Sequence, residues 1–208
     1  GVLVLVSFMQ LYQDRLSALI NVFALHAMVL TLSVAWQAFV QHAPHLYITA
    51  AIALVFKAII IPVALRRIVI KLGIHREIDN VVGVGLAMLA GMGLVALSMV
   101  VMLRVTADAD PLAREDLAFA LSVVLLGLLM MVTRRNAVSQ VIGFMSIENG
   151  LFFSAMVSTF GMPMVVELGV AFDVLVAAVL FGVFFFQMRE SIDSLDVDRL
   201  NRLREVDE

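Results

Sequence analysis

The sequence predicts an all-α, polytopic membrane protein with about seven transmembrane helices, and two observations lead to this prediction. Hydrophobic residues make up 62% of the 208 residues, whereas soluble domains contain about 45–50% apolar residues. The apolar residues are gathered in runs of about twenty, the length that crosses a hydrocarbon core of roughly 30 Å. We therefore expect nearly all of the chain to lie inside the bilayer.

Each apolar run is predicted to form one membrane span, and the connections between them are short. The first run, "GVLVLVSFMQLYQ", lacks the basic segment and the small-residue cleavage site of a signal peptide. It resembles the second part of a span, so we expect further residues before Gly1. The expected spans are residues 1–13, 17–40, 46–65, 81–104, 115–133, 137–160 and 163–187.

These spans are expected to group into three regions. Residues 1–110 hold four spans, and residues 111–190 hold three. Residues 191–208 form a charged tail whose leucines and one valine recur at three- to five-residue spacing, which predicts a short amphipathic helix. Such a helix can lie on lipid headgroups, but the mixture of acids and arginines favours docking on a partner protein.

The basic residues sort to one side of the predicted topology. Because loops rich in lysine and arginine remain in the cytoplasm, the amino terminus is expected outside and the carboxyl terminus in the cytoplasm. The opposite side holds Arg104 and Arg114 among acidic residues. The residues predicted on the cytoplasmic side are Arg15, Arg66, Arg67, Lys71, Arg76, Arg134, Arg135, Arg189, Arg199, Arg202 and Arg204.

The chain contains 0 cysteines, which excludes disulfides and thiolate-bound iron–sulfur clusters or zinc. His42 and His45 are close together, but the pattern favours a solvated loop because neither a carboxylate nor a third histidine joins them. No cofactor and no metal are therefore expected in this subunit. Any electron chemistry is assigned to partner subunits.

Four ionisable residues on four different spans are expected to share one depth near the middle of the bilayer. Counted at 1.5 Å per residue, these are His26, Lys57, Glu148 and Asp173, and Glu167 lies a turn or two nearer the outside. A charge at the centre of a membrane helix costs roughly 2.5–3.5 kcal/mol. They are therefore expected to face a protein interior or a hydrated cavity, as groups of a proton relay do.

Each of these residues also has a structural interpretation that the sequence leaves open. Glu148 or Asp173 can form a static pair with a lysine of a neighbouring subunit. His26 can be an interhelical hydrogen-bonding residue, and Glu167 can simply reach the outer interface. Pro62, five residues after Lys57, removes an amide donor and is expected to kink the third span.

The fourth span is rich in small residues, which allow close contact between membrane helices. The sequence there, "VVGVGLAMLAGMGLVALSMVV", predicts an assembly surface for another subunit. The small residues are Gly83, Gly85, Ala87, Ala90, Gly91 and Gly93.

The stretches "TRRNAVSQVIGFMSIENG", "FGMPMVVELGVAFDVLV" and "ESIDSLDVDRLNRLR" resemble the E component of hydrogenase-4-type membrane complexes. These complexes are the membrane arms of group 4 nickel–iron hydrogenases and formate hydrogenlyases. The last three spans are also similar to the small K component of complex I and to the C component of multisubunit sodium/proton antiporters. The specific part of the resemblance covers residues 133–204, and the first four spans resemble the extra amino-terminal helices of the hydrogenase component.

In the K component of complex I, an "RRN" loop precedes a span that carries a glycine and, two residues later, a buried glutamate. Residues 134–136 and Gly143 match this pattern, but Met145 stands at the glutamate position and the acid follows at Glu148. Three residues are nearly one helical turn, so roughly the same face is kept. The second buried acid of the family matches Asp173. The resemblance implies that both acids belong to a hydrated proton path along the membrane arm.

The resemblance implies a non-catalytic subunit of a redox-driven complex in a bacterial or archaeal cytoplasmic membrane. Its expected role is to carry part of a proton path and to bridge antiporter-like subunits to the hydrogenase-docking arm, with no nucleic-acid partner. One rival hypothesis is a subunit of a sodium/proton antiporter without a redox module. Another is a scaffold whose buried acids only pair between subunits. Whether protons or sodium ions move is left open.

Overall fold

The computed structural model describes residues 1–40, 45–71, 78, 81–106, 111–159, 169 and 182. The chain divides into two compact units, Gly1–Val170 and Ala171–Glu208, and the helices discussed below all belong to the first unit. The regular structure of the described residues is entirely helical, which confirms the predicted all-α class. The predicted seventh span and the tail lie outside the described residues, apart from the isolated positions Gly169 and Gly182.

The helices follow the predicted spans closely. A continuous helical run at the third span consists of α3 (His45–Ala53), the π-helix η1 (Leu54–Ile60) and α4 (Ile61–Lys71). It continues six residues past the expected end at residue 65. The other helices are α1 (Val2–Tyr12), α2 (Leu16–Val40), α5 (Val84–Val105), α6 (Pro111–Thr133) and α7 (Ala137–Thr159).

Four of the described helices are long and apolar enough to cross a membrane. They correspond to α2, α5, α6 and α7, and the shorter α1 is also apolar. The length and composition of these helices support a membrane protein.

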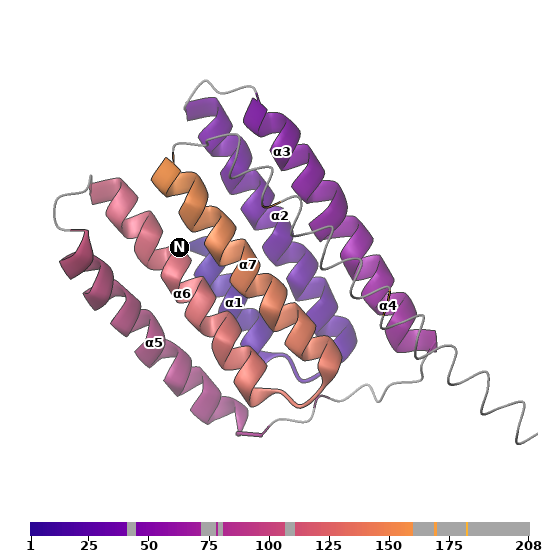
Figure 1. The fold of residues 1–208 in the computed structure, drawn as a ribbon. Coiled ribbons are helices and arrows are strands. Elements are labelled where there is room, and N and C mark those ends of the chain that lie inside the picture. Colours follow the sequence, from indigo (N-terminus) through magenta and orange to yellow (C-terminus); the bar gives the residue numbers. More distant parts are fainter. Residues whose placement is uncertain are drawn as a thin grey trace, which may run out of the picture. The chain divides into compact units, whose positions relative to one another are not determined.

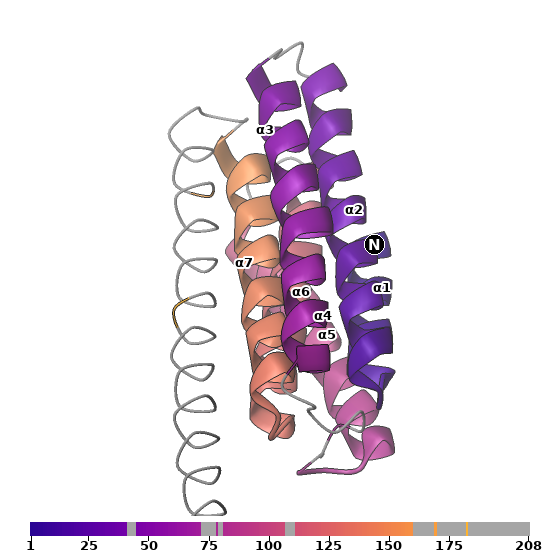
Figure 2. The same cartoon turned by 90° about the vertical axis from the view of Figure 1, so that its right-hand side faces the viewer.

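The helices of the first unit form two layers. One layer is α5–α6–α7, and the other is α1–α2 followed by the run from α3 to α4 (Figure 1). Helix α1 packs on α5 and α6, and α2 packs on α7. Figure 2 shows the α3–α4 run beside α2, and Lys57 of η1 contacts Glu148 of α7. The interior between the layers is therefore lined by α1, α2, η1, α6 and α7.

The irregularity expected at Pro62 takes the form of a change in helix type. Proline lacks an amide hydrogen, and its ring clashes with the carbonyl four residues earlier. The chain accommodates Pro62 with the wider turns of η1 directly before it, where Ile61 N–H bonds to the carbonyl of Phe56, five residues back. π-Helical turns are frequent at functional sites. Here the π-helix contains Lys57, which is 2% exposed.

The small residues of the predicted assembly surface on α5 divide between two sides of the helix. Gly91 is buried, and a Cβ atom built on it would lie 2.9 Å from Phe8 and 3.0 Å from Leu126. Among the described residues, no atom lies within 4 Å of a Cβ built on Gly85 or Gly93. Gly91 therefore serves packing inside the unit, whereas Gly85 and Gly93 face away from it.

Candidate functional site

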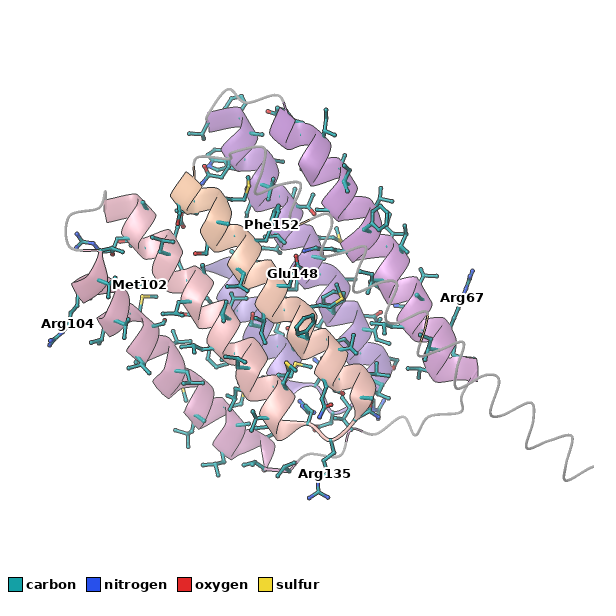
Figure 3. The ribbon with its side chains drawn as sticks, in the orientation of Figure 1. Arg67, Met102, Arg104, Arg135, Glu148 and Phe152 are labelled. Carbon is teal, nitrogen blue, oxygen red and sulfur yellow. The ribbon has the colours of Figure 1, made fainter. Side chains whose placement is uncertain are left out.

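An ion pair in the interior of the first unit forms the centre of the candidate site. Lys57 Nζ of η1 contacts Glu148 Oε2 of α7, and the two residues are 2% and 6% exposed. The Lys57 ammonium also lies 5.3 Å from the centre of the Phe152 ring, one turn further along α7 (Figure 3). Glu148 therefore contacts a cation of its own chain.

Asn149 extends this pair to a second helix. Its Oδ1 accepts a hydrogen bond from Lys57 Nζ at 3.0 Å, and its Nδ2 lies 3.1 Å from Nδ1 of His26 on α2. Asn149 and His26 are both 0% exposed. Since an amide accepts through oxygen and donates through nitrogen, Asn149 links the lysine to the histidine in one fixed direction.

Ser7 of α1 completes the network and determines the tautomer of His26. The Ser7 hydroxyl donates to the Leu3 carbonyl at 2.9 Å, and its Oγ lies 3.1 Å from His26 Nε2. A hydroxyl has one hydrogen to donate, so Ser7 Oγ accepts from His26 Nε2–H. His26 Nδ1 then accepts from Asn149, which assigns a neutral imidazole protonated on Nε2.

The hydrogen bonds of the site thus run in one direction, from Lys57 through Asn149, His26 and Ser7 to the Leu3 carbonyl. We call the five side chains of Ser7, His26, Lys57, Glu148 and Asn149 the polar network. Removing two charges from water is costly, and the cost is offset only where the pair has good geometry and further hydrogen bonds. The polar network supplies such bonds across the helices it joins, which lets a full ion pair reside between apolar helices.

A second group of polar contacts lies between this network and one end of the bundle. Ser146, one turn before Asn149 on α7, approaches Gln10 Oε1 at 2.8 Å. Arg134, in the connection between α6 and α7, donates from Nη2 to the Leu11 carbonyl at 2.5 Å. Its Nη1 lies 3.9 Å from Asp14 Oδ1. These contacts attach the last turn of α1 to α6 and α7.

Arg134 is buried, with a side chain that is 2% exposed. Burial lowers the pKa of its guanidinium, and the nearby Asp14 carboxylate acts in the opposite direction. An arginine side chain remains protonated in proteins despite such a shift. Arg134 therefore holds a permanent positive charge at this end of the bundle, where Arg135 also lies (Figure 3).

The structure brings together three of the five residues that the sequence marked as relay candidates. His26, Lys57 and Glu148 belong to one network, while Asp173 and Glu167 lie outside the described residues. Ser7 and Asn149 were not predicted as site residues from the sequence. The available signal was weak: a carboxamide next to a buried acid, and a serine inside an apolar run.

A candidate metal centre is not found in the part of the chain that the structure describes. No group of three or more histidine, cysteine, aspartate or glutamate side chains is placed there to hold a metal ion. The polar network is instead an arrangement of proton donors and acceptors around one ion pair.

Comparison with known proteins gives two related groups. The chain is 32% identical over 153 residues to "Uncharacterized protein Rv0085" of Mycobacterium tuberculosis, and the matched region covers 73% of this chain and 70% of that protein. It is also 32% identical over 91 residues to "Hydrogenase-4 component E" of Escherichia coli K12, and this region covers 44% of this chain and 42% of that protein. The same component of Shigella flexneri matches equally. No family model and no solved structure match the chain.

The second match confirms a relationship to hydrogenase-4 component E, which the sequence motifs predicted. The matched region spans less than half of that component.

Proposed function

This chain belongs to the family of the mycobacterial protein Rv0085, and we propose that it is a membrane subunit of a respiratory-type hydrogenase complex related to complex I. Its role is to contribute buried ionisable groups to a proton path and to bridge antiporter-like subunits to the hydrogenase-docking arm. The partial match to hydrogenase-4 component E supports a place in a membrane complex. Redox chemistry belongs to the partner subunits.

The observation that carries the proposal is the polar network around Lys57 and Glu148. A charged pair in a membrane helix bundle is expensive and tends to mark a functional site. A protein with a well-packed apolar pair in place of such a buried ion pair is often equally stable, so stability alone does not account for the charges. Asn149 links the pair to His26 by hydrogen bonds. Because a carboxamide does not pass protons on, the exchange that this arrangement supports is the one between Lys57 and Glu148, which are in direct contact.

The proposed mechanism is a shift of charge within the network. Transfer of a proton from the Lys57 ammonium to the Glu148 carboxylate neutralises both groups without changing the net charge of the site. The neutral lysine then takes up a proton from one direction, and the protonated carboxyl releases one in another. The relay set comprises Glu148, Asp173, Lys57, His26 and Glu167, with the Glu148–Lys57 pair at its centre.

The proposal includes a topology for the whole chain. Seven spans place the amino terminus outside and the carboxyl terminus in the cytoplasm of a bacterial or archaeal membrane, following the distribution of arginine. Residues 111–190 form a bundle similar to the K component of complex I and the C component of multisubunit antiporters. Residues 191–208 form the amphipathic tail that docks on a partner.

The test is the Glu148→Gln variant of the intact complex in sealed vesicles, with electron-transfer turnover and proton pumping measured on the same sample. We expect normal turnover without pumping, or the loss of coupled turnover, in complex that is fully assembled. Ser98→Ala is the matched control, because Ser98 is also a buried hydrogen-bonding residue but contacts Ser122 and Ala118 of α6. It should leave pumping unchanged.

A double variant separates transport from folding. Glu148→Gln alone leaves the Lys57 charge in the interior without its counter-ion, so poor assembly would be ambiguous. Lys57→Met combined with Glu148→Leu removes both charges. If the double variant assembles but fails to pump protons, the result supports the proton relay. If it assembles and pumps normally, the result contradicts the relay and favours the scaffold hypothesis. Proton transport by the natural chain in the absence of any redox partner would favour the antiporter hypothesis.

A further inference from the structure

Three buried polar atoms near the arginine-rich end of the bundle lack a hydrogen-bond partner. Among the residues that the structure describes, these atoms are Gln10 Nε2, Arg134 Nη1 and Ser139 Oγ. Gln10 is 1% exposed, Arg134 2% and Ser139 0%. Buried polar groups are almost always paired with protein or ordered water, because an unpaired one loses its hydration without compensation.

The three atoms belong to one region between the end of α1 and the start of α7. Gln10 contacts Ser146, and Ser139 lies seven residues before Ser146, on the same face of α7 and about 10 Å away along the helix axis. Arg134 contacts the carbonyl of Leu11, the residue next to Gln10. We call Gln10, Arg134, Ser139 and Ser146 the inlet cluster.

We propose that the inlet cluster holds buried water and forms a hydrated passage from the arginine-rich end of the bundle to the polar network. Water both donates and accepts, so it satisfies the amide and guanidinium N–H groups of Gln10 and Arg134 together with the hydroxyl of Ser139. A buried water requires two to four polar partners, and the cluster offers polar atoms from two helices and a connection.

The polar residues continue from the inlet cluster toward the ion pair by single helical turns. On α1, Gln10 lies one turn after Ser7, which contacts His26. On α7, Ser146 lies one turn before Asn149, which contacts His26 and Lys57. The inlet cluster therefore adjoins the polar network at Ser7 and Asn149. The assignment of this passage to proton supply rests on the proposed function, whereas the presence of water does not.

Single cysteines test for the water directly, since the natural chain contains 0 cysteines. Ser139→Cys is introduced into the assembled complex in sealed vesicles and exposed to a small methanethiosulfonate reagent from each face in turn. Thiols react as thiolates, which form readily only where water is present. Ser122→Cys is the dry control, because Ser122 is also 0% exposed but bonds to Ser98 and Ala118.

We expect Ser139→Cys to react at least about tenfold faster than Ser122→Cys, because only the hydrated thiol supplies thiolate. The reaction should come from the face that modifies Arg135→Cys, since Arg135 is exposed at that end. A rate equal to that of Ser122→Cys, or reaction from the opposite face, overturns the proposal. If Ser139→Cys does not assemble, Gln10→Cys is judged by the same criterion, because Gln10 Nε2 is another unpaired buried atom of the inlet cluster.

The outcome is independent of the transport assay. Reactive Ser139→Cys together with normal pumping by Glu148→Gln leaves the hydrated passage standing and removes the proton relay. Unreactive Ser139→Cys and Gln10→Cys, together with lost pumping by Glu148→Gln, remove the passage and leave the relay supplied from elsewhere.

Discussion

Lys57 of η1 and Glu148 of α7 are 91 residues apart in the sequence and form an ion pair in the interior of the first unit. The pair joins the two layers of helices, since η1 lies in the layer of α1 and α2 and α7 lies in the layer of α5 and α6. It is thus both a structural link and the chemical centre of the candidate site. Substitution of one partner or of both separates these two roles.

The first prediction concerns the stability of the pair. Lys57→Met or Glu148→Leu alone should destabilise the protein by about 3–5 kcal/mol, because each leaves one charge buried without its partner. The double variant should be destabilised by much less than the sum. Thermal unfolding of the purified protein in detergent measures all three. Additive losses would mean that the two side chains do not interact, contrary to the structure.

The second prediction concerns the protonation of His26. The hydrogen bonds from Asn149 and to Ser7 assign a neutral ring with its hydrogen on Nε2. Nitrogen-15 magnetic resonance of histidine-labelled protein should show this tautomer, with the signal identified by its loss in His26→Gln. In Asn149→Leu, the donor to Nδ1 is lost and the tautomer preference should weaken. A doubly protonated ring would contradict the assigned direction of the network.

The sequence predicted that three of the site residues lie at one level along the helices, but not which atoms contact each other. A rise of 1.5 Å per residue placed His26, Lys57 and Glu148 at one level, and the structure brings these three together. The sequence did not predict which side of each helix faces the interior, because membrane helices are apolar on the lipid-facing side as well as inside. The ion pair therefore emerged only from the fold.

The uncharged members of the site were harder to find for a physical reason. Ser7 and Ser146 cost much less to insert into a membrane helix than a charge does, so they do not stand out in an apolar run. On α7, however, Ser139, Ser146 and Asn149 recur at helical spacing. That polar stripe was the signal that would have indicated the interior face of α7.

The third prediction concerns the close contact between α6 and α7. A Cβ atom on Gly127 would lie 2.9 Å from the Gly143 carbonyl oxygen and 3.0 Å from the Ile147 amide nitrogen, so backbone would have to move. Gly127→Ala should therefore cost about 1–3 kcal/mol, the usual cost of overpacking. Gly93→Ala is the control, since no described atom lies within 4 Å of its Cβ position. Thermal unfolding of both variants should separate them clearly.

Gly93 offers a related test of the assembly surface on α5. Gly93→Ile leaves the isolated chain unstrained, because the added side chain points away from the first unit. If α5 contacts another subunit through its small residues, as close helix packing favours, this variant should reduce the recovery of the complex without destabilising the isolated chain. Full recovery of the complex would argue against a contact at this position.

The fourth prediction concerns Arg134, whose guanidinium binds the Leu11 carbonyl and lies near Asp14. Arg134→Lys keeps the positive charge but loses the planar fork that reaches both groups. It should destabilise the protein by about 1–3 kcal/mol, the cost of leaving a buried acceptor unpaired. Arg135→Lys is the control, because Arg135 is exposed and should tolerate the change. Equal stability of the two variants would remove the proposed link between α1 and the α6–α7 connection.

The fifth prediction is that transport through this subunit does not depend on sodium. Sodium sites in membrane proteins are built from several oxygen ligands, including carboxylates and backbone carbonyls. Here the Lys57 ammonium contacts the Glu148 carboxylate and also donates a hydrogen bond to the side-chain oxygen of Asn149. A sodium ion beside that ammonium would be repelled by a like charge at short range, whereas a proton can pass between the two groups. Pumping by the assembled complex should therefore be equal in sodium-free and sodium-containing buffers of the same ionic strength. Pumping that requires sodium in the natural complex, and loses that requirement in Glu148→Gln, would instead assign a sodium ion to this site and require Lys57 to leave it during turnover.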